Sequence, residues 1–230
     1  MHFFVASKMR FDRAGRFALL ELLAQTRHLR CTDGRDGVYA FLGLVREDYG
    51  IVPDYSPGSG GIERLLVDVA CRVVKMERRL DVLSYACVAR RGFGDGGRLV
   101  LPSWVPDWSC GRCGKVRERT VVEVEGEVDE RLTPRVCDGG RLEVHGYKVG
   151  TFENGQRFVV HLEGVGVWVG SGQEEDEVWA LVGARNPFVL RRVPGGDGYR
   201  VVREVGFKKQ TNLATLALRH RLQSEKVLIV

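Results

Sequence analysis

Hydrophobic residues recur at helical spacing through roughly the first ninety positions of the chain. The run from residue 13 to residue 30 repeats apolar side chains on one face. The clearest pattern lies between residues 62 and 74, where apolar side chains fall at i, i+3, i+4, i+7, i+8, i+11 and i+12 and charged ones take the other face. Both runs predict amphipathic helices packed on a core.

A shorter helix is predicted between them. Asp33 stands where a capping residue is expected, Asp36 places negative charge in the first turn, and Gly43 is the expected stop. Capping accounts for both carboxylates, so their spacing does not require a catalytic acid–base pair. A local ion pair with Arg35 would contribute about 0–1 kcal/mol at the surface.

Beyond the glycine-rich segment 92–97 the pattern changes to short apolar runs bounded by turn residues, which predict strands. These runs are 121–125, 142–144, 158–162, 165–169, 178–182, 188–190 and 199–202. Their even spacing favours an antiparallel meander or a small barrel. The predicted fold class is therefore α+β, with an N-terminal helical subdomain followed by an antiparallel β-rich subdomain.

Four segments are predicted along the chain. A helical subdomain spans 1–92, a connection rich in Gly, Pro and Trp spans 93–117, and the β-rich subdomain spans 118–206. The remaining residues 207–230 form a basic tail, interpreted as an aberrant terminus.

The net charge of +5 is concentrated at the end of the chain. Residues 208–230 hold five basic residues and one acidic residue, a surplus of four that leaves about +1 for the rest. A nucleic-acid surface would gather positive charge on one face of the folded domain, so no nucleic-acid partner is expected. No run is long enough for a membrane span and no signal peptide is recognisable, so an intracellular, cytoplasmic location is expected.

Six cysteines lie without regular spacing and are expected to be free thiols. Cys110 and Cys113 form a Cys-x-x-Cys pair, and Cys137 is the nearest further thiol. A closed zinc site needs four ligands, and no second Cys-x-x-Cys or His-x-x-x-His pair is present. The pair is thus a weak metal candidate, and two cysteines in a glycine-rich loop is the favoured interpretation.

No other catalytic or cofactor motif stands out. The five histidines are far apart and near no nucleophile motif, and the Gly-x-Gly segments lack the features of a phosphate-binding loop. Neither a catalytic residue nor a cofactor is predicted. Trp104 and Trp108 flank two prolines; the favoured interpretation is a hydrophobic clasp between the two halves, and a ligand platform is the alternative.

Several segments resemble the region that follows the heterokaryon-incompatibility (HET) domain in fungal proteins. Residues 32–44 are similar to its Thr-Asp-Pro-Arg-Asp-Lys-Val-Tyr-Ala motif, although Gly34 replaces the proline and Gly37 the lysine. Residues 53–56 and 101–109 match Pro-Asp-Tyr-Ser and Leu-Pro-Ser-Trp-Val-Pro-Asp-Trp-Ser. The motif positions, expected to be structural, are Asp33, Arg35, Asp36, Tyr39, Pro53, Asp54, Tyr55, Trp104, Pro106, Asp107 and Trp108.

The resemblance implies a role in fungal non-self recognition and the cell death that follows fusion of incompatible strains. The Trp-Ile-Asp and Cys-Ile-Asn-Gln signatures of the HET domain itself are not found in this sequence. The chain is accordingly expected to be a truncated relative.

Three functions remain open from the sequence. The first is a non-catalytic part of a HET-type protein that contacts protein partners. The second is an enzyme that cleaves NAD as TIR domains do, with its site in a missing N-terminal domain or in a partner. The third is a small zinc-binding interaction module.

Overall fold

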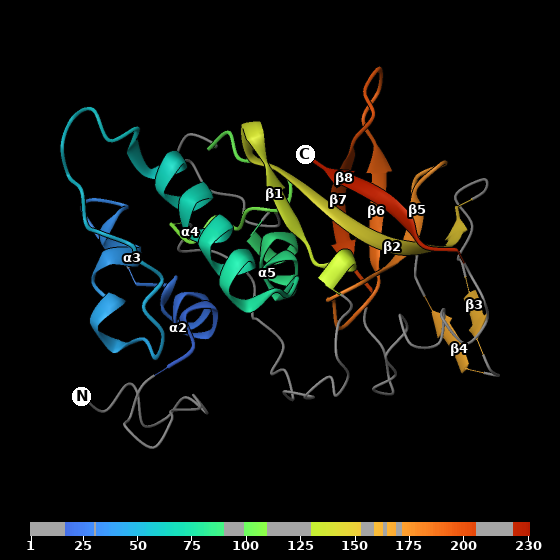
Figure 1. Ribbon diagram of the computed structural model, residues 1–230, viewed down its shortest axis with the longest axis horizontal. Helices are drawn as coiled ribbons and strands as arrows, with labels where there is room; N and C mark the ends of the chain where they lie inside the picture. The colour runs from blue at the N-terminus through green and yellow to red at the C-terminus, as the bar shows by residue number, and fades with distance from the viewer. Residues whose placement is uncertain are drawn as a thin grey trace.

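The computed structural model describes residues 17–29, 31–89, 99–109, 130–152, 159–162, 165–168, 172–205 and 223–230. N-terminal helices lie beside a small β-barrel (Figure 1), which confirms the predicted α+β class. The predicted strand at 121–125 lies outside the described residues.

The helices occupy the first ninety residues. Those described are α2 (Leu19–Thr26), α3 (Asp36–Tyr39), α4 (Gly61–Glu77) and α5 (Asp81–Ala89), with the 3₁₀ turn η1 (Leu42–Leu44) after α3. Helix α4 follows the predicted periodicity, since its side chains at the i, i+3, i+4 positions are buried. It ends at Glu77; the next residue, Arg78, still donates its N–H to the Val74 carbonyl, and its left-handed backbone (φ 51°) then turns the chain away from the helix.

The predicted short helix differs in detail. Helix α3 begins at Asp36, and the expected stop, Gly43, lies inside η1. The difference arises because the N–H groups of Phe41 and Leu44 bond carbonyls three residues back, which tightens the chain into 3₁₀ turns. The prediction that Asp33 caps this helix is wrong: the N-cap position is Arg35 and no side chain caps α3, because the Asp33 carboxylate accepts the backbone N–H of Arg35 itself, at 2.9 Å.

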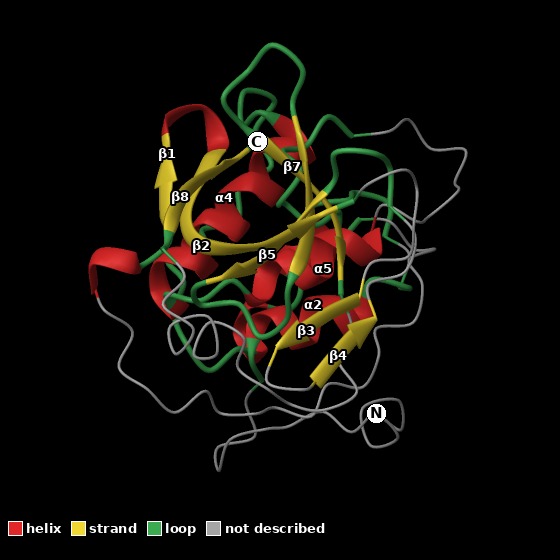
Figure 2. Cartoon of the chain, turned by 90° about the vertical axis from the view of Figure 1, so that its right-hand side faces the viewer, coloured by secondary structure: helices red, strands yellow, loops and turns green. Residues whose placement is uncertain are grey.

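Strands make up the second half. They are β1 (Arg135–Cys137), β2 (Arg141–Thr151), β3 (Val159–Leu162), β4 (Val165–Trp168), β5 (Glu177–Leu181), β6 (Phe188–Arg192), β7 (Tyr199–Glu204) and β8 (Glu225–Ile229), with short 3₁₀ turns η2 (Glu130–Leu132) and η3 (Asp138–Gly140) near β1. Strands β2, β5, β6 and β7 form an antiparallel meander, and β8 lies between β7 and β2. The five strands close into a barrel, with β1 added beside β2; Figure 2 shows it from the side away from the helices.

Strand β8 comes from residues 207–230, which the sequence sets apart as a basic tail. It pairs antiparallel with β2 over five residues and meets β7 in parallel at Tyr199 and Ile229. Val227 and Ile229 face the barrel interior and are 1% and 0% exposed. The end of the chain is therefore part of the barrel wall, because these two apolar side chains fill its core.

Helices and barrel share one hydrophobic core. The main cluster of buried residues joins side chains of α2, α4 and α5 to interior residues of β2, β5, β6, β7 and β8. Helix α5 packs on β7, where the Ser84 hydroxyl donates to Glu204 at 2.8 Å. No helix among the described residues is long and apolar enough to cross a membrane.

Candidate functional site

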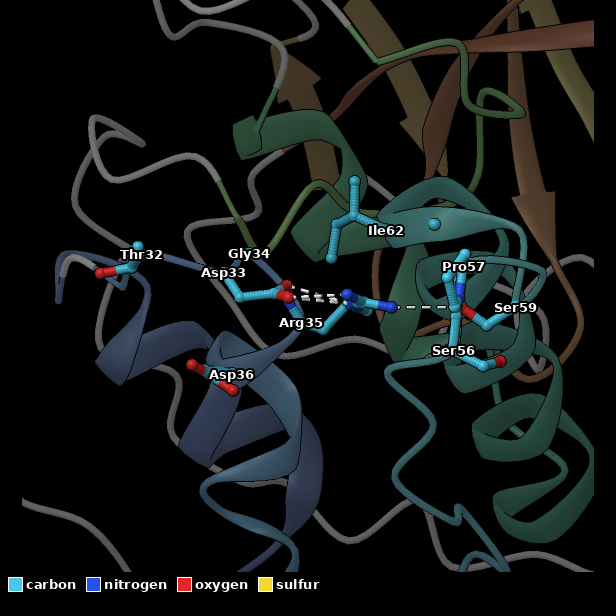
Figure 3. A pocket seen from close by; sticks show the side chains of 10 residues that line it. Thr32, Asp33, Gly34, Arg35, Asp36, Ser56, Pro57, Ser59 and Ile62 are labelled. Atoms are coloured by element: carbon cyan, nitrogen blue, oxygen red, sulfur yellow. Dashed lines mark hydrogen bonds and ion pairs between the residues drawn. The ribbon is translucent and has the colours of Figure 1, made fainter.

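The first two family-motif segments meet at an open pocket of about 600 Å³ (Figure 3). One wall is the segment that leads into α3, and the other is the loop that leads into α4. The lining residues are Thr32, Asp33, Gly34, Arg35, Asp36, Ser56, Pro57, Ser59, Gly61 and Ile62.

Arg35 holds the two walls together. Its guanidinium donates to both carboxylate oxygens of Asp33, with Nη2 to Oδ2 at 2.7 Å and Nε to Oδ1 at 3.0 Å. The same group donates through Nη1 to the Ser59 hydroxyl at 3.1 Å and to the Asp54 carbonyl at 3.3 Å. The hydrogen bonds from Arg35 lower the pKa of Asp33, and the same pairing raises the pKa of Arg35.

A second link joins α3 to the same loop. The hydroxyl of Tyr55 donates to the Asp36 carboxylate at 2.5 Å, and this bond raises the pKa of Tyr55 to about 12. The Tyr55 ring lies edge-on to the Tyr39 ring at 5.2 Å and below the Arg35 guanidinium at 5.0 Å. Asp33 is therefore paired with Arg35 inside the pocket, and Asp36 is paired with Tyr55 of the loop before α4.

The loop before α4 is also stabilised by hydrogen bonds between its own residues. The Asp54 carboxylate accepts the Ser56 N–H at 2.9 Å, and the Ser59 hydroxyl donates to the Ser56 carbonyl at 2.9 Å. Hydrogen bonds from the side chain and backbone of Ser56 lower the pKa of Asp54. These bonds give the turn at 56–59 a defined shape ahead of the helix.

The third motif segment lies against the first. A Cβ placed on Gly34 would lie 3.8 Å from Ser109, and one on Gly37 would lie 4.0 Å from the Trp108 carbonyl. Both distances are ordinary van der Waals contacts, so the two segments lie side by side and a Cβ at either position would fit between them. Asp107 accepts both the N–H and the hydroxyl of Ser109, which closes the end of this segment.

Trp104 and Trp108 are 0% and 2% exposed and belong to the shared core. The Trp104 indole N–H donates to the Gly140 carbonyl at 2.8 Å, just ahead of β2. Neither ring has an open face on which a ligand would stack. Pro106 is buried beside them, whereas Pro53 is exposed in the loop before α4.

The structure describes one of the three candidate metal-binding cysteines. Cys110 and Cys113 lie outside the described residues, and Cys137 is a free, half-buried thiol at the end of β1. Within the described ranges no three His, Cys, Asp or Glu side chains are grouped as a metal site requires.

One polar cluster was not predicted from the sequence. Glu177 has only 5% of its side chain exposed, and it bonds Lys148 at 2.8 Å, Trp179 at 2.9 Å and Arg192 at 3.2 Å, and also Tyr199. Burial acts to raise the pKa of Glu177, but these hydrogen bonds outweigh it and lower the pKa. These partners come from the four strands β2, β5, β6 and β7. The order of residues within any one strand therefore does not predict the cluster.

No family model matches this chain, and no solved structure matches it. The sequence is 32% identical over 109 residues to heterokaryon incompatibility protein 6, OR allele, of Neurospora crassa. That match covers 44% of this chain but 16% of the relative, so the chain spans a small part of the relative's length. The chain is a distant, partial relative of a fungal heterokaryon incompatibility protein.

Proposed function

We propose that this chain acts as a non-catalytic part of a HET-type protein in fungal non-self recognition. The observation that carries the proposal is the pairing within the motif segments. Asp33 is neutralised by Arg35, and Asp36 is held by Tyr55. Charged side chains that satisfy one another in this way build a joint between two segments and supply no free acid, base or nucleophile to a substrate.

The similarity to heterokaryon incompatibility protein 6 supports the biological context. The joint would present the pocket rim and the loop before α4 in a fixed arrangement to a protein partner. Exposed loops held by a rigid scaffold are common sites of recognition. No nucleic-acid or cofactor role is proposed.

Expression in Neurospora crassa tests the recognition role. A strain that expresses the chain should form fewer stable heterokaryons with an otherwise compatible strain than the same strain carrying an empty vector. The double variant Asp33→Ala, Arg35→Ala should lose the effect because it removes the joint. Arg200→Ala removes an exposed cation of the barrel and should retain the effect. Unchanged heterokaryon formation with the native chain would refute the proposal.

A separate assay tests the non-catalytic role. Purified chain incubated with NAD should leave the NAD concentration unchanged over hours, as measured by chromatography. Turnover that follows protein concentration would show that the chain is an enzyme. NAD turnover would refute the non-catalytic part of the proposal only; the recognition role would still be decided by the heterokaryon assay.

A further inference from the structure

The loop that leads into α4 presents a serine in a distinctive setting. Residues 52–58 are exposed in an unbroken run and belong to no helix or strand; they form part of the long loop before α4 at the left of Figure 1. Val52 is 78% exposed and Tyr55 is 50% exposed. Ser56 lies in this run and is followed by Pro57, which favours an extended backbone at the serine. An exposed Ser-Pro dipeptide is the sequence that proline-directed protein kinases modify, and here it opens the turn at 56–59.

Positive charge lies next to this serine. The Arg35 guanidinium donates to the Ser59 hydroxyl and the Asp54 carbonyl, on either side of Ser56. Arg64 also lies close enough to lower the pKa of Asp54. Helix α4 begins without a side-chain cap, and its first residue, Gly61, lines the same pocket as Ser56. Arginine side chains and a helix N-terminus both favour a phosphate group.

Negative charge nearby opposes a phosphate. The Asp54 carboxylate bonds both the backbone and the side chain of Ser56. Asp33 already occupies one edge of Arg35. A phosphate on Ser56 would carry about −1.5 to −2 charge, more than either carboxylate, and would therefore compete with both for the arginines.

We propose that Ser56 is a phosphorylation site for a proline-directed protein kinase, and that the phosphate rearranges the hydrogen bonds around Arg35. A bond forms between Ser56 Oγ and the γ-phosphorus of ATP, and the bond from that phosphorus to the β–γ bridging oxygen breaks. ADP leaves, and the hydroxyl proton passes to the kinase. The phosphate then draws Arg35 from Asp33 and displaces Asp54. This proposal is independent of the recognition function, because it rests only on the loop and its neighbouring charges.

Mass spectrometry tests the modification. The folded chain, incubated with a purified proline-directed kinase and ATP, should gain one phosphoryl group on Ser56. Ser56→Ala and Pro57→Ala should each abolish this gain, and Ser59→Ala should retain it. The proposal is overturned if the folded chain is not modified at Ser56, whether or not a peptide of residues 50–60 is modified.

A ³¹P NMR titration tests the second half of the proposal. Phosphoserine loses its last proton near pH 6, and neighbouring arginines lower that pKa. The pKa of the Ser56 phosphate should be lower in the folded chain than in urea, and Arg35→Gln should bring it back toward the unfolded value. Arg64→Gln provides the same test if Arg35→Gln does not fold by circular dichroism. A pKa that is equal or higher in the folded chain would mean that Asp54 dominates, and would overturn the rearrangement.

Discussion

Ile229 should be among the most sensitive positions for the stability of this protein, although it is the residue before the last. Its side chain is 0% exposed, and its backbone stands opposite Leu142 on one side and Tyr199 on the other. Ile229→Ala removes methyl and methylene groups from the place where the last strand closes the barrel. For a fully buried aliphatic residue the lost transfer free energy and the cavity together cost about 2–5 kcal/mol.

A matched variant on the same strand separates burial from strand membership. Lys226 has 62% of its side chain exposed and pairs with Glu143 at 3.1 Å. Because exposed ion pairs contribute little, Lys226→Ala should lower the free energy of unfolding by about 1 kcal/mol at most. Both variants keep the backbone pairing to β2, so the difference between them reports the interior side chain.

Urea unfolding followed by tryptophan fluorescence measures both variants, since the chain has four tryptophans. A single domain has about 5–15 kcal/mol of stability, so the expected loss in Ile229→Ala is a large fraction of the total. The transition midpoint should fall sharply for Ile229→Ala and barely move for Lys226→Ala. Equal midpoints for the two variants would refute the closure of the barrel by β8.

Three further variants test other parts of the fold. Trp104→Phe leaves the half-buried Gly140 carbonyl, which precedes β2, without its indole donor, so the free energy of unfolding should fall by about 0.5–1.5 kcal/mol; an unchanged thermal midpoint would contradict that bond. Gly146→Ala would place a Cβ 2.8 Å from the Leu181 side chain, and the strain should cost about 1–3 kcal/mol in urea unfolding. Burial raises the pKa of Glu77 even though Tyr49 donates to it at 2.8 Å. The folded state therefore favours the protonated form, and stability is lost as the pH rises from 4.5 through the higher folded pKa. Glu77→Gln cannot ionise and should remove that loss. The free energy of unfolding of Glu77→Gln, measured in urea relative to that of the native chain, should therefore increase with pH. A difference in free energy that does not change with pH would contradict the raised pKa.

Local pattern in the sequence was sufficient for most of the architecture. Helix α4 lies where the sequence pattern predicts it because it buries one face, and β5, β6 and β7 do so because each is a short apolar run bounded by turn residues. The β5–β6–β7 part of the meander also follows from the pattern, since short turns between strands favour neighbours in the sheet. These features depend on residues that are close in the sequence.

Strand β8 could not be predicted in the same way. It begins with Glu225 and Lys226, and only Val227 and Ile229 face the core. Its partners, β2 and the parallel β7, belong to elements already paired in the meander. From the sequence alone, a segment that begins with two charged residues is interpreted as solvent-exposed. The closed barrel supplies an interior that two alternate side chains can fill.

The motif around Arg35 shows why charge spacing alone gave an incomplete account. The sequence places Asp33 and Asp36 at the start of one helix and allows a local ion pair with Arg35. The structure contains the Asp33–Arg35 pair, but Asp33 does not cap the helix, and Asp36 accepts a hydrogen bond from Tyr55, nineteen residues away. The loop that brings Tyr55 back has no periodicity from which its path could be derived.

This arrangement explains how two motif segments act as one unit. Removing Arg35 would leave Asp33 without its cation and the Ser59 hydroxyl without this donor. It would also leave the Asp54 carbonyl with the Tyr39 hydroxyl as its remaining donor, at 3.5 Å. A single change would therefore disturb the entry to α3 and the turn before α4 together. The pairing gives residues 32–39 and 53–59 a common structural requirement. In this protein the motif is therefore explained by the joint it builds between two helices.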